Sequence, residues 1–514
     1  MASAATAPQP GEARAVAAVA RAVFPARRAV VACAPVNDAR ALDRAAVGAC
    51  AALACVAVVP AALAPLWDAD VWWILRAGRD MLAESALPQR NRYGFTAPDS
   101  PWVMHEWGFG VVYALLARDG LAGLALARLG AVALAAAAAS WRAFRDARGW
   151  VAALCVAVTL TVYGGRFESP RPVGVTYALA CALAAVVFEP AFARRHVALV
   201  AALMVVWTNA HGSFPLGVLL AALGAMAPGG DRRARVGALA LAALATLANP
   251  YGLALHALAL RYALGEGGDA VAVVHARIVE WWPLWRDPLR VASAPELAGL
   301  VALVAVALAS LRDARWRPRA LAVLILAAMA LRHSRHLGLA GLVGVPLLAG
   351  PVEALVARGA WAPRAVPRAV WALCVALPTT LGVALWGAAA RSRTEGQWVD
   401  ASAQDEAVRA MVAELPAGAR VFAELPFTGY VVLLGAPRVS VYFDARNDCY
   451  PAAVLRRALD LNDGRVAPDE ARRWLREAGA THAIARCRSS AARSLAACAR
   501  VAARDGVCLF RVGE

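Results

Sequence analysis

The stretch AAVGACAALACVAVVPAALAPLWDADVWW, residues 45–73, joins an apolar run directly to two aspartates and three tryptophans. Its apolar part, 45–66, falls in the range of roughly 17–25 residues that a helix needs to cross a bilayer. Further apolar runs of similar character occupy 121–140, 150–163, 173–189, 196–209, 213–227, 234–248, 295–312, 319–331, 336–356 and 367–389. The sequence therefore predicts a mainly α fold, a polytopic transmembrane helical bundle of about 11 spans.

Composition supports a membrane protein. The chain has 514 residues, of which 61% are hydrophobic and 17% charged, whereas soluble domains carry about 25% charged residues. The formal net charge is +17, and the sequence contains no lysine. Nucleic-acid binding is not expected, because the arginines lie between apolar runs and do not form one basic face.

The distribution of arginine orients the spans, because short cytoplasmic loops collect this residue. With the N-terminus in the cytoplasm, every predicted inner loop is rich in arginine. These residues are Arg142, Arg145 and Arg148; Arg194 and Arg195; Arg232, Arg233 and Arg235; Arg312, Arg315, Arg317 and Arg319; Arg358, Arg364 and Arg368. Segment 106–117 is too short to span, so we expect a helix at the interface. Residues 1–44 are predicted to be a cytoplasmic tail, disordered or amphipathic, since arginines interrupt the apolar core that a signal peptide needs.

The spans define a transmembrane domain, 45–389. Because their number is odd and the N-terminus is expected in the cytoplasm, the remaining segment, 390–514, is expected to be an extracytoplasmic domain. Alternating apolar residues predict strands at 420–424 and 438–443, and helical patterns predict helices at 451–460 and 466–479. This segment is therefore expected to be a small α/β domain. Its cysteines can form disulfides in an oxidising compartment, and their three pairings stay open: Cys449, Cys487, Cys498 and Cys508.

The large outer loop, 67–120, carries the first candidate site residues. Asp68 and Asp70 follow the first span, and His105 and Glu106 lie later in the same loop. Converging carboxylates suit general-base chemistry or divalent-metal binding. The simpler alternative is that the aspartates mark the water boundary and the neighbouring tryptophans anchor it.

Cationic side chains gather in other outer loops. The motif RHSRH places Arg332, His333, Arg335 and His336 on the outer side, against the charge trend, and guanidinium groups bind phosphate well. Further candidates are Arg166, Arg171 and His211. Pairing with Glu168, Asp68 or lipid head groups is the alternative for the arginines, and a core position is the alternative for His211.

Together these motifs resemble the GT-C superfamily of integral membrane glycosyltransferases, within a bacterial group of glycosyltransferase-like membrane proteins. The resemblance covers roughly residues 45–512. It rests on the order of WDADVWW (67–73), RNRYGFTAP (90–98), PWVMHEW (101–107), WTNAHGSFPLG (207–217), RHLGLAGLVGVPLLA (335–349) and FTGYVVLLGAPRVSVYFDARND (427–448).

The resemblance implies an extracytoplasmic transfer of sugar from a polyprenyl-phosphate-linked donor to a glycan, lipid or protein acceptor, in the inner membrane of a bacterium. It implies that Asp70, or else Asp68, is the catalytic base or a metal ligand, and that Glu106 belongs to a second acidic motif. The Arg332–His336 cluster is then expected to face the donor phosphate. Acceptor binding or packing against the membrane part is implied for Gly429, Tyr430, Asp444 and Arg446. No organic cofactor is indicated, and a divalent metal ion is an option.

Two other functions are compatible with the sequence. A transporter or flippase for a lipid-linked or anionic substrate would use the same outer cations, although transporters tend to bind near the membrane midplane on broken helices. A non-catalytic scaffold would keep the fold without the chemistry.

Overall fold

The computed structural model describes residues 52, 56 and 59–513, apart from 148, 169, 265–268, 357–367 and 401–404. Residues 45–514 belong to one compact unit. The tail predicted for 1–44 and most of the first predicted span lie outside the described residues.

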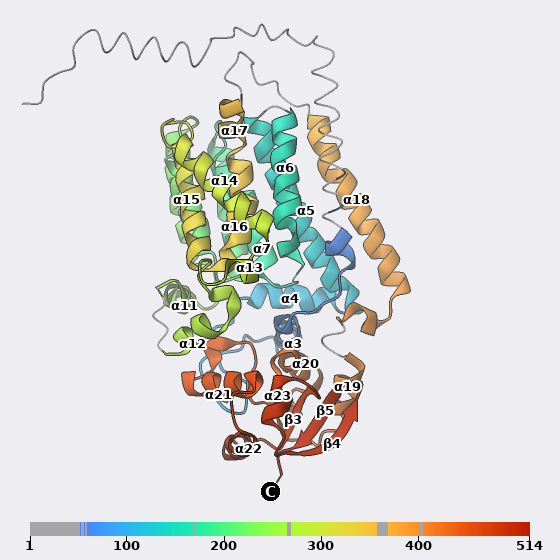
Figure 1. Cartoon of the computed structure of the whole chain (residues 1–514). Helices are drawn as coiled ribbons and strands as arrows, with labels where there is room; N and C mark the ends of the chain where they lie inside the picture. Colours follow the sequence, from blue (N-terminus) through green and yellow to red (C-terminus); the bar gives the residue numbers. More distant parts are fainter. Residues whose placement is uncertain are drawn as a thin grey trace, which may run out of the picture. The chain divides into compact units, whose positions relative to one another are not determined.

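Each later predicted span is helical in the structure, and these helices form the bundle in Figure 1. The run 336–356 is two helices that meet at an angle of 53°. The bundle helices are α5 (Ala122–Asp146), α6 (Gly149–Tyr163), α7 (Val173–Val187), α8 (Arg194–Ala210), α9 (Pro215–Ala225), α10 (Arg232–Ala245), α14 (Ala294–Ser310), α15 (Arg317–Arg332), α16 (Leu337–Leu347), α17 (Ala349–Val356) and α18 (Arg368–Ser392).

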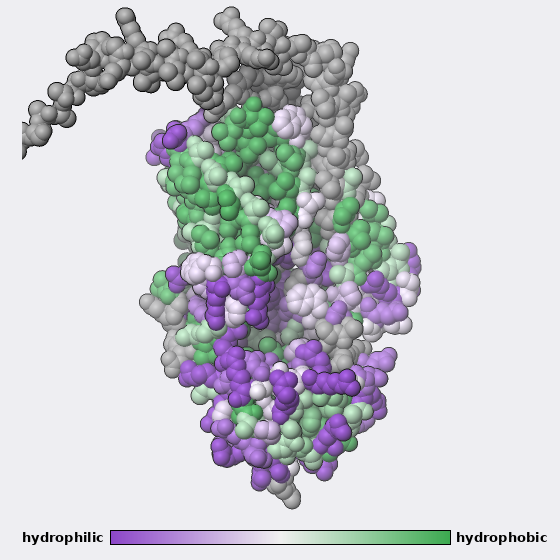
Figure 2. Space-filling view, viewed as in Figure 1, coloured by the Kyte–Doolittle hydropathy of each residue, from purple (hydrophilic) through white to green (hydrophobic). Residues whose placement is uncertain are grey.

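The predicted count of about 11 spans is not confirmed. Within the described residues, two helical segments are long and apolar enough to cross a bilayer, Ala122–Asp146 and Gly149–Phe167, and the bent pair α16–α17 adds a third if it is one span. Several other apolar helices are shorter than the roughly 20 residues of a straight crossing. Figure 2 shows that apolar residues cover much of the bundle, whereas hydrophilic residues dominate over the C-terminal domain.

Buried arginines at helix ends hold one end of the bundle together. Arg142 and Arg319 both pair with Asp146, at 2.6 Å and 2.7 Å. The Arg235 guanidinium donates to the carbonyls of Val187 and Glu189, which end or follow α7. Since the last carbonyls of a helix lack partners within it, these arginines satisfy groups that are costly to bury alone.

The outer loop folds into two packed helices, α3 (Ala69–Glu84) and α4 (Trp107–Leu116). Asp68 caps α3 by accepting a hydrogen bond from the Asp70 backbone amide at 3.0 Å. Gly78 lets the helices approach closely, because a Cβ there would lie 1.9 Å from the Gly110 carbonyl oxygen. The predicted short helix at 106–117 is thus present as α4.

Segment 249–294, which joins two predicted spans and for which no helix was predicted, is largely helical. It forms α11 (Leu253–Leu264), α12 (Asp269–Arg277), the 3₁₀ turn η2 (Val279–Trp281) and α13 (Pro288–Val291). This segment carries Glu280 between two short helices.

The C-terminal segment is an α/β domain with a five-stranded sheet in the order β2-β1-β3-β5-β4. β1 is parallel to β2 and β3, and β5 is antiparallel to β3 and β4. The elements are α19 (Asp405–Glu414), β1 (Ala419–Ala423), α20 (Leu425–Gly435), β2 (Val439–Val441), α21 (Ala452–Asp463), α22 (Pro468–Glu477), β3 (His482–Arg486), α23 (Ser490–Ser494), β4 (Ala499–Arg504) and β5 (Val507–Arg511). Both predicted strands and both predicted helices are present. Of the possible pairings, Cys487–Cys508 is formed, while Cys449 and Cys498 are buried thiols.

The C-terminal domain shares its hydrophobic core with α3 and α4. Helix α20 packs against α3, where Tyr430 meets Trp72 with ring centroids 5.0 Å apart. A Cβ at Gly429 would lie 2.0 Å from the Ala69 carbonyl oxygen, so this contact requires glycine. The domain therefore fixes the first turn of the helix that carries Asp70.

Candidate functional site

A cavity of about 530 Å³ lies where the bundle helices meet α3, the segment before α4, segment 249–294 and the loop after β2. Its lining contains both ionisable and apolar side chains. The ionisable ones include Asp70, His105, Glu106, Arg171, His211, Glu280, Arg332, His333, Arg335, His336 and Asp448. The apolar ones include Leu216, Leu219, Leu255, Leu258, Ala259, Met329 and Leu339.

Asp70 sits in the first turn of α3, where Trp73 Nε1 donates to its Oδ1 at 3.1 Å. Burial raises the pKa of Asp70 to about 7, and the neighbouring Asp68 carboxylate adds to this rise while Arg171 opposes it. A carboxyl group with such a pKa changes protonation state near neutral pH, which a general base requires.

Arg171 connects three acidic side chains. Its guanidinium lies 2.9 Å from Asp68 Oδ2, 3.4 Å from Asp70 Oδ2 and 2.8 Å from Glu280 Oε2. Glu280 also pairs with Arg335 at 3.6 Å. Burial would raise the pKa of Glu280, but Arg335 and Arg171 outweigh it and lower that pKa to about 2. Glu280 is therefore ionised and holds both guanidinium groups.

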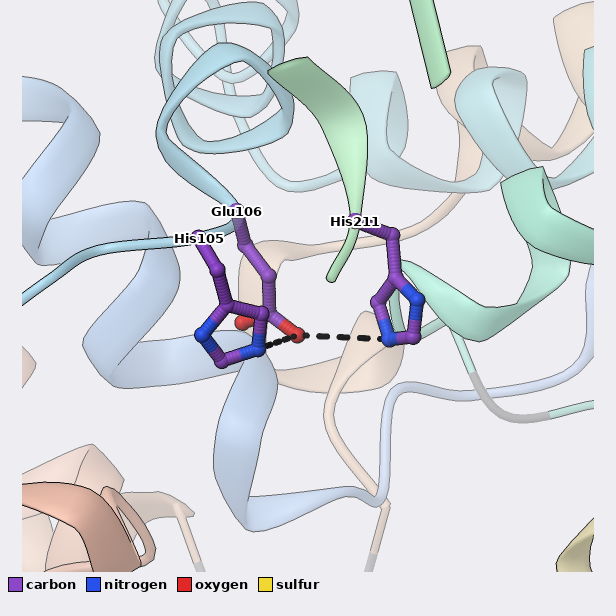
Figure 3. A group of neighbouring side chains, drawn as sticks. All are labelled: His105, Glu106 and His211. Atoms are coloured by element: carbon purple, nitrogen blue, oxygen red, sulfur yellow. Dashed lines mark ion pairs between the residues drawn. The ribbon is translucent and has the colours of Figure 1, made fainter. Parts of the chain in front are cut away.

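Glu106 lies between two imidazoles, as Figure 3 shows. Its Oε1 is 3.4 Å from His105 Nε2 and 3.7 Å from His211 Nε2. Burial opposes the charge on His105, but the Glu106 carboxylate outweighs it and raises the His105 pKa to about 9. Burial lowers the pKa of His211 to about 3, so His211 is neutral. One acidic oxygen and two ring nitrogens are a donor set that fits a divalent metal ion.

The Arg332–His336 cluster lines the cavity beside η2. His333 Nδ1 donates to the Trp281 carbonyl at 2.7 Å, and the Arg335 guanidinium stacks 4.3 Å from the Trp281 ring centroid. The cationic cluster predicted from the sequence therefore reaches the same cavity as Asp70.

Three of the predicted substrate-binding residues are not part of the cavity wall. Arg166 pairs with Glu296 at 2.6 Å, and Tyr430 is buried against Trp72. Asp444 forms a fully buried ion pair with Arg446 at 2.7 Å.

Arg446 touches the cavity, yet its contacts join the two parts of the fold. Its guanidinium stacks between the rings of Tyr93 and Trp102, 4.7 Å and 4.4 Å from their centroids, and donates to Asn91 Oδ1. Of the two roles implied for Tyr430, Asp444 and Arg446, packing against the outer loop agrees better with these contacts than acceptor binding.

Two cavity carboxylates were not predicted, Glu280 and Asp448. In the sequence, Glu280 precedes two tryptophans in EWW (280–282), and Asp448 is the last residue of FDARND (443–448). Burial raises the pKa of Asp448, while the positive charge of His105 opposes that rise. The sequence offered only a single acidic residue between predicted elements in each case, which does not by itself predict a site residue.

No protein-family model and no curated protein sequence matches the chain. Among solved structures, it is similar to the oligosaccharyltransferase of Archaeoglobus fulgidus, captured with a tethered acceptor peptide, with a TM-score of 0.50 and 9% identity. The alignment covers 85% of this chain and 68% of that one. The apo form of the same enzyme aligns with a TM-score of 0.48 and 12% identity, over 84% of this chain and 69% of that one.

The chain is also similar to the mycobacterial arabinofuranosyltransferase AftD, with a TM-score of 0.48 and 16% identity, over 92% of this chain and 40% of that one. The similarity to the archaeal enzyme concerns the fold alone, and it agrees with the mainly helical architecture that the sequence predicted.

Proposed function

We propose that this protein is a membrane glycosyltransferase that moves a sugar from a lipid-phosphate donor to an acceptor on the extracytoplasmic side. The observation that carries the proposal is the placement of Asp70, with its pKa raised to about 7, in a cavity lined by both charged and apolar side chains. A fold shared with glycosyltransferases agrees with it, but function must be argued from the site.

The two kinds of lining side chain suit the two chemical parts of a lipid-linked sugar. Arg171 and Arg335 offer guanidinium groups, which bind phosphate through paired hydrogen bonds. The apolar lining residues, such as Leu216, Leu255 and Leu258, suit the first segments of a hydrocarbon chain. A polyprenyl phosphate has both features, which favours this donor class over a soluble nucleotide sugar.

The proposed reaction is a displacement at the anomeric carbon. Asp70 removes the proton from a hydroxyl or amine of the acceptor, and the acceptor atom forms a bond to that carbon. The bond from the anomeric carbon to the phosphate oxygen breaks, and the electron pair leaves with the lipid phosphate. Arg171 and Arg335 stabilise the charge that develops on the phosphate. A divalent ion held by His105, Glu106 and His211 would add positive charge near the phosphate, and no step above depends on it.

The test is a transfer assay with purified protein in lipid nanodiscs. Wild type, Asp70→Asn and the matched control Asp99→Asn are incubated with a panel of polyprenyl-phosphate sugars and a membrane extract as acceptor. Asp99 lies in the same outer loop, and its side chain is 82% exposed. We expect wild type and Asp99→Asn to release free lipid phosphate at equal rates, and Asp70→Asn to lose at least about 10²-fold in rate, the lower range for a general base.

The same assay separates the alternative functions. A transporter or flippase would move labelled donor across proteoliposomes without releasing lipid phosphate, and a scaffold would do neither. Either result with folded wild-type protein would contradict the proposal.

A further inference from the structure

The side chains of His105, Glu106 and His211 form a cluster that the proposed reaction does not use. His105 and Glu106 directly precede α4, and His211 directly follows α8. Figure 3 shows the two imidazoles approaching one carboxylate from these separate segments. One donor atom from each residue lies within 4.8 Å of the others.

The spacing of these atoms differs from that of ordinary ion pairs. Charge-assisted N–H···O bonds are about 2.7–2.9 Å long, whereas Glu106 Oε1 lies 3.4 Å and 3.7 Å from the two ring nitrogens. Tetrahedral coordination with metal–ligand bonds of about 2.0–2.2 Å places neighbouring donor atoms about 3.3–3.6 Å apart. The separation of 3.4 Å falls in this range and that of 3.7 Å lies just beyond it, so both are closer to the spacing around one metal ion than to charge-assisted hydrogen bonds.

The backbone around the cluster is fixed before any ion binds. Trp107 Nε1 donates to Asn209 Oδ1 at 3.0 Å, which ties the start of α4 to the end of α8. A Cβ at Gly108 would lie 2.6 Å from the Asn209 carbonyl oxygen, and one at Gly212 would lie 3.0 Å from the His105 ring. Two glycines thus allow the approach that brings the three side chains together.

His211 also has the outer partners that a ligating imidazole needs. Its Nδ1 lies 2.8 Å from Ser213 Oγ and 3.0 Å from Thr176 Oγ1. The Ser213 backbone N–H also donates to Nδ1, at 3.3 Å, so Nδ1 accepts in the ion-free protein and Nε2 carries the ring proton. An ion bound at Nε2 would displace that proton. Partners of this kind orient metal-bound histidines and fix their tautomer.

We propose that His105, Glu106 and His211 form a binding site for one divalent transition-metal ion of the zinc class, with an open coordination position facing the cavity. Two imidazole nitrogens and one carboxylate oxygen suit Zn²⁺ and its first-row neighbours. Mg²⁺ and Ca²⁺ prefer sites made only of oxygen ligands, so they are disfavoured. All three ligands line the cavity, so a bound ion would meet the donor or the acceptor there.

The test measures metal binding without donor or acceptor, so its outcome is separate from that of the transfer assay. Full-length protein is purified in detergent with a histidine-free tag, stripped with a chelator, and titrated with Zn²⁺ and Co²⁺. We expect about one ion per chain, retained against a large excess of Mg²⁺, and a visible Co²⁺ spectrum of the intense four-coordinate type.

Variants assign the ligands. His105→Ala and His211→Ala should each weaken Zn²⁺ binding by at least tenfold, whereas His482→Ala, in β3 and away from the cavity, should bind like wild type. His211→Cys keeps a ligand at that position, so its Co²⁺ complex should gain a thiolate charge-transfer band even if the alanine variants fold poorly. The proposal is overturned by wild-type protein that binds no stoichiometric ion, by displacement with Mg²⁺, or by a His211→Cys complex without that band.

Discussion

At the scale of the residue, Asp70 is set apart from Asp68 by its surroundings. Asp68 caps α3 and pairs with Arg171 at 2.9 Å, whereas Asp70 carries a pKa raised to about 7 by burial and by Asp68. The sequence placed both aspartates at the end of the first span and favoured Asp70 as the base. The two aspartates have different roles because of Arg171, which is distant in the sequence and contacts them only in the folded protein.

The pH dependence of transfer should report this pKa. Since Asp70 accepts a proton only when ionised, we expect kcat/KM to rise with pH with a midpoint near 7, well above the value of about 4 for an ordinary aspartate. In Asp68→Asn the repelling charge is gone and Arg171 can turn to Asp70, so the midpoint should move to lower pH. Asparagine keeps the helix cap. A midpoint that is the same in both proteins would contradict the assignment of Asp70.

Glu280 should compete with the donor phosphate, because its carboxylate holds Arg171 and Arg335. In Glu280→Gln both guanidinium groups lose their charged partner. We expect the Kd for a polyprenyl phosphate to fall on the order of tenfold, equivalent to about 1.4 kcal/mol. Isothermal titration with lipid phosphate in nanodiscs measures the Kd. The control is Glu84→Gln, because Glu84 pairs with Arg92 within the outer loop 67–120 and is not in the cavity wall. A larger Kd for Glu280→Gln than for wild type would mean that Glu280 orients the arginines and does not compete with phosphate.

At the scale of the element, the helices of the bundle and the α/β character of 390–514 could be predicted from hydropathy and periodicity. The short helices between the predicted spans could not be predicted in this way. Segment 249–294 lacked a long apolar run, so α11, α12 and η2 were missed, and Glu280 with them. Its partner Arg171 lies 109 residues away in the sequence, and no local pattern records a contact over that distance.

The docking of α20 on α3 should control the site, because Gly429 lies against the backbone of Ala69, next to Asp70. Gly429→Ala adds a Cβ 2.0 Å from the Ala69 carbonyl oxygen, so the helices must separate. We expect a loss of about 1–3 kcal/mol in unfolding free energy and at least a tenfold lower turnover, because small displacements of a reacting group are costly.

Thermal unfolding and the transfer assay measure the two effects of Gly429→Ala. Gly237→Ala in α10 is the control, because a Cβ there meets nothing within 4 Å. Wild-type turnover in Gly429→Ala would show that the C-terminal domain does not position Asp70.

At the scale of the whole molecule, four parts of the chain build one cavity. The bundle supplies Arg171, His211 and the Arg332–His336 cluster, and the outer loop supplies Asp70 and Glu106. Segment 249–294 supplies Glu280, and the C-terminal domain supplies Asp448. The sequence indicated that the candidate residues share one side of the membrane. It left two roles open for Arg166, Tyr430 and Asp444, ligand binding or pairing and packing, and could not choose between them because their partners are set by the fold.

The membrane orientation predicts which surfaces an outside reagent can reach. Cysteines are introduced at Arg233, in the first turn of α10, and at Arg500 in β4, both of which are exposed. In intact cells, a membrane-impermeant maleimide should label Arg500→Cys and should label Arg233→Cys only after permeabilisation. The opposite pattern would place the cavity on the cytoplasmic side and contradict an extracytoplasmic reaction.

The most direct test of the central claim is to measure donor binding and single-turnover sugar transfer on the same preparations of wild type and Asp70→Asn. A general base acts on the acceptor, so Asp70→Asn should bind the polyprenyl-phosphate sugar with a Kd within about threefold of wild type while its transfer rate falls at least about 10²-fold. A transfer rate equal to that of wild type at saturating donor would show that Asp70 is not the base, and the proposed chemistry of this cavity would be wrong.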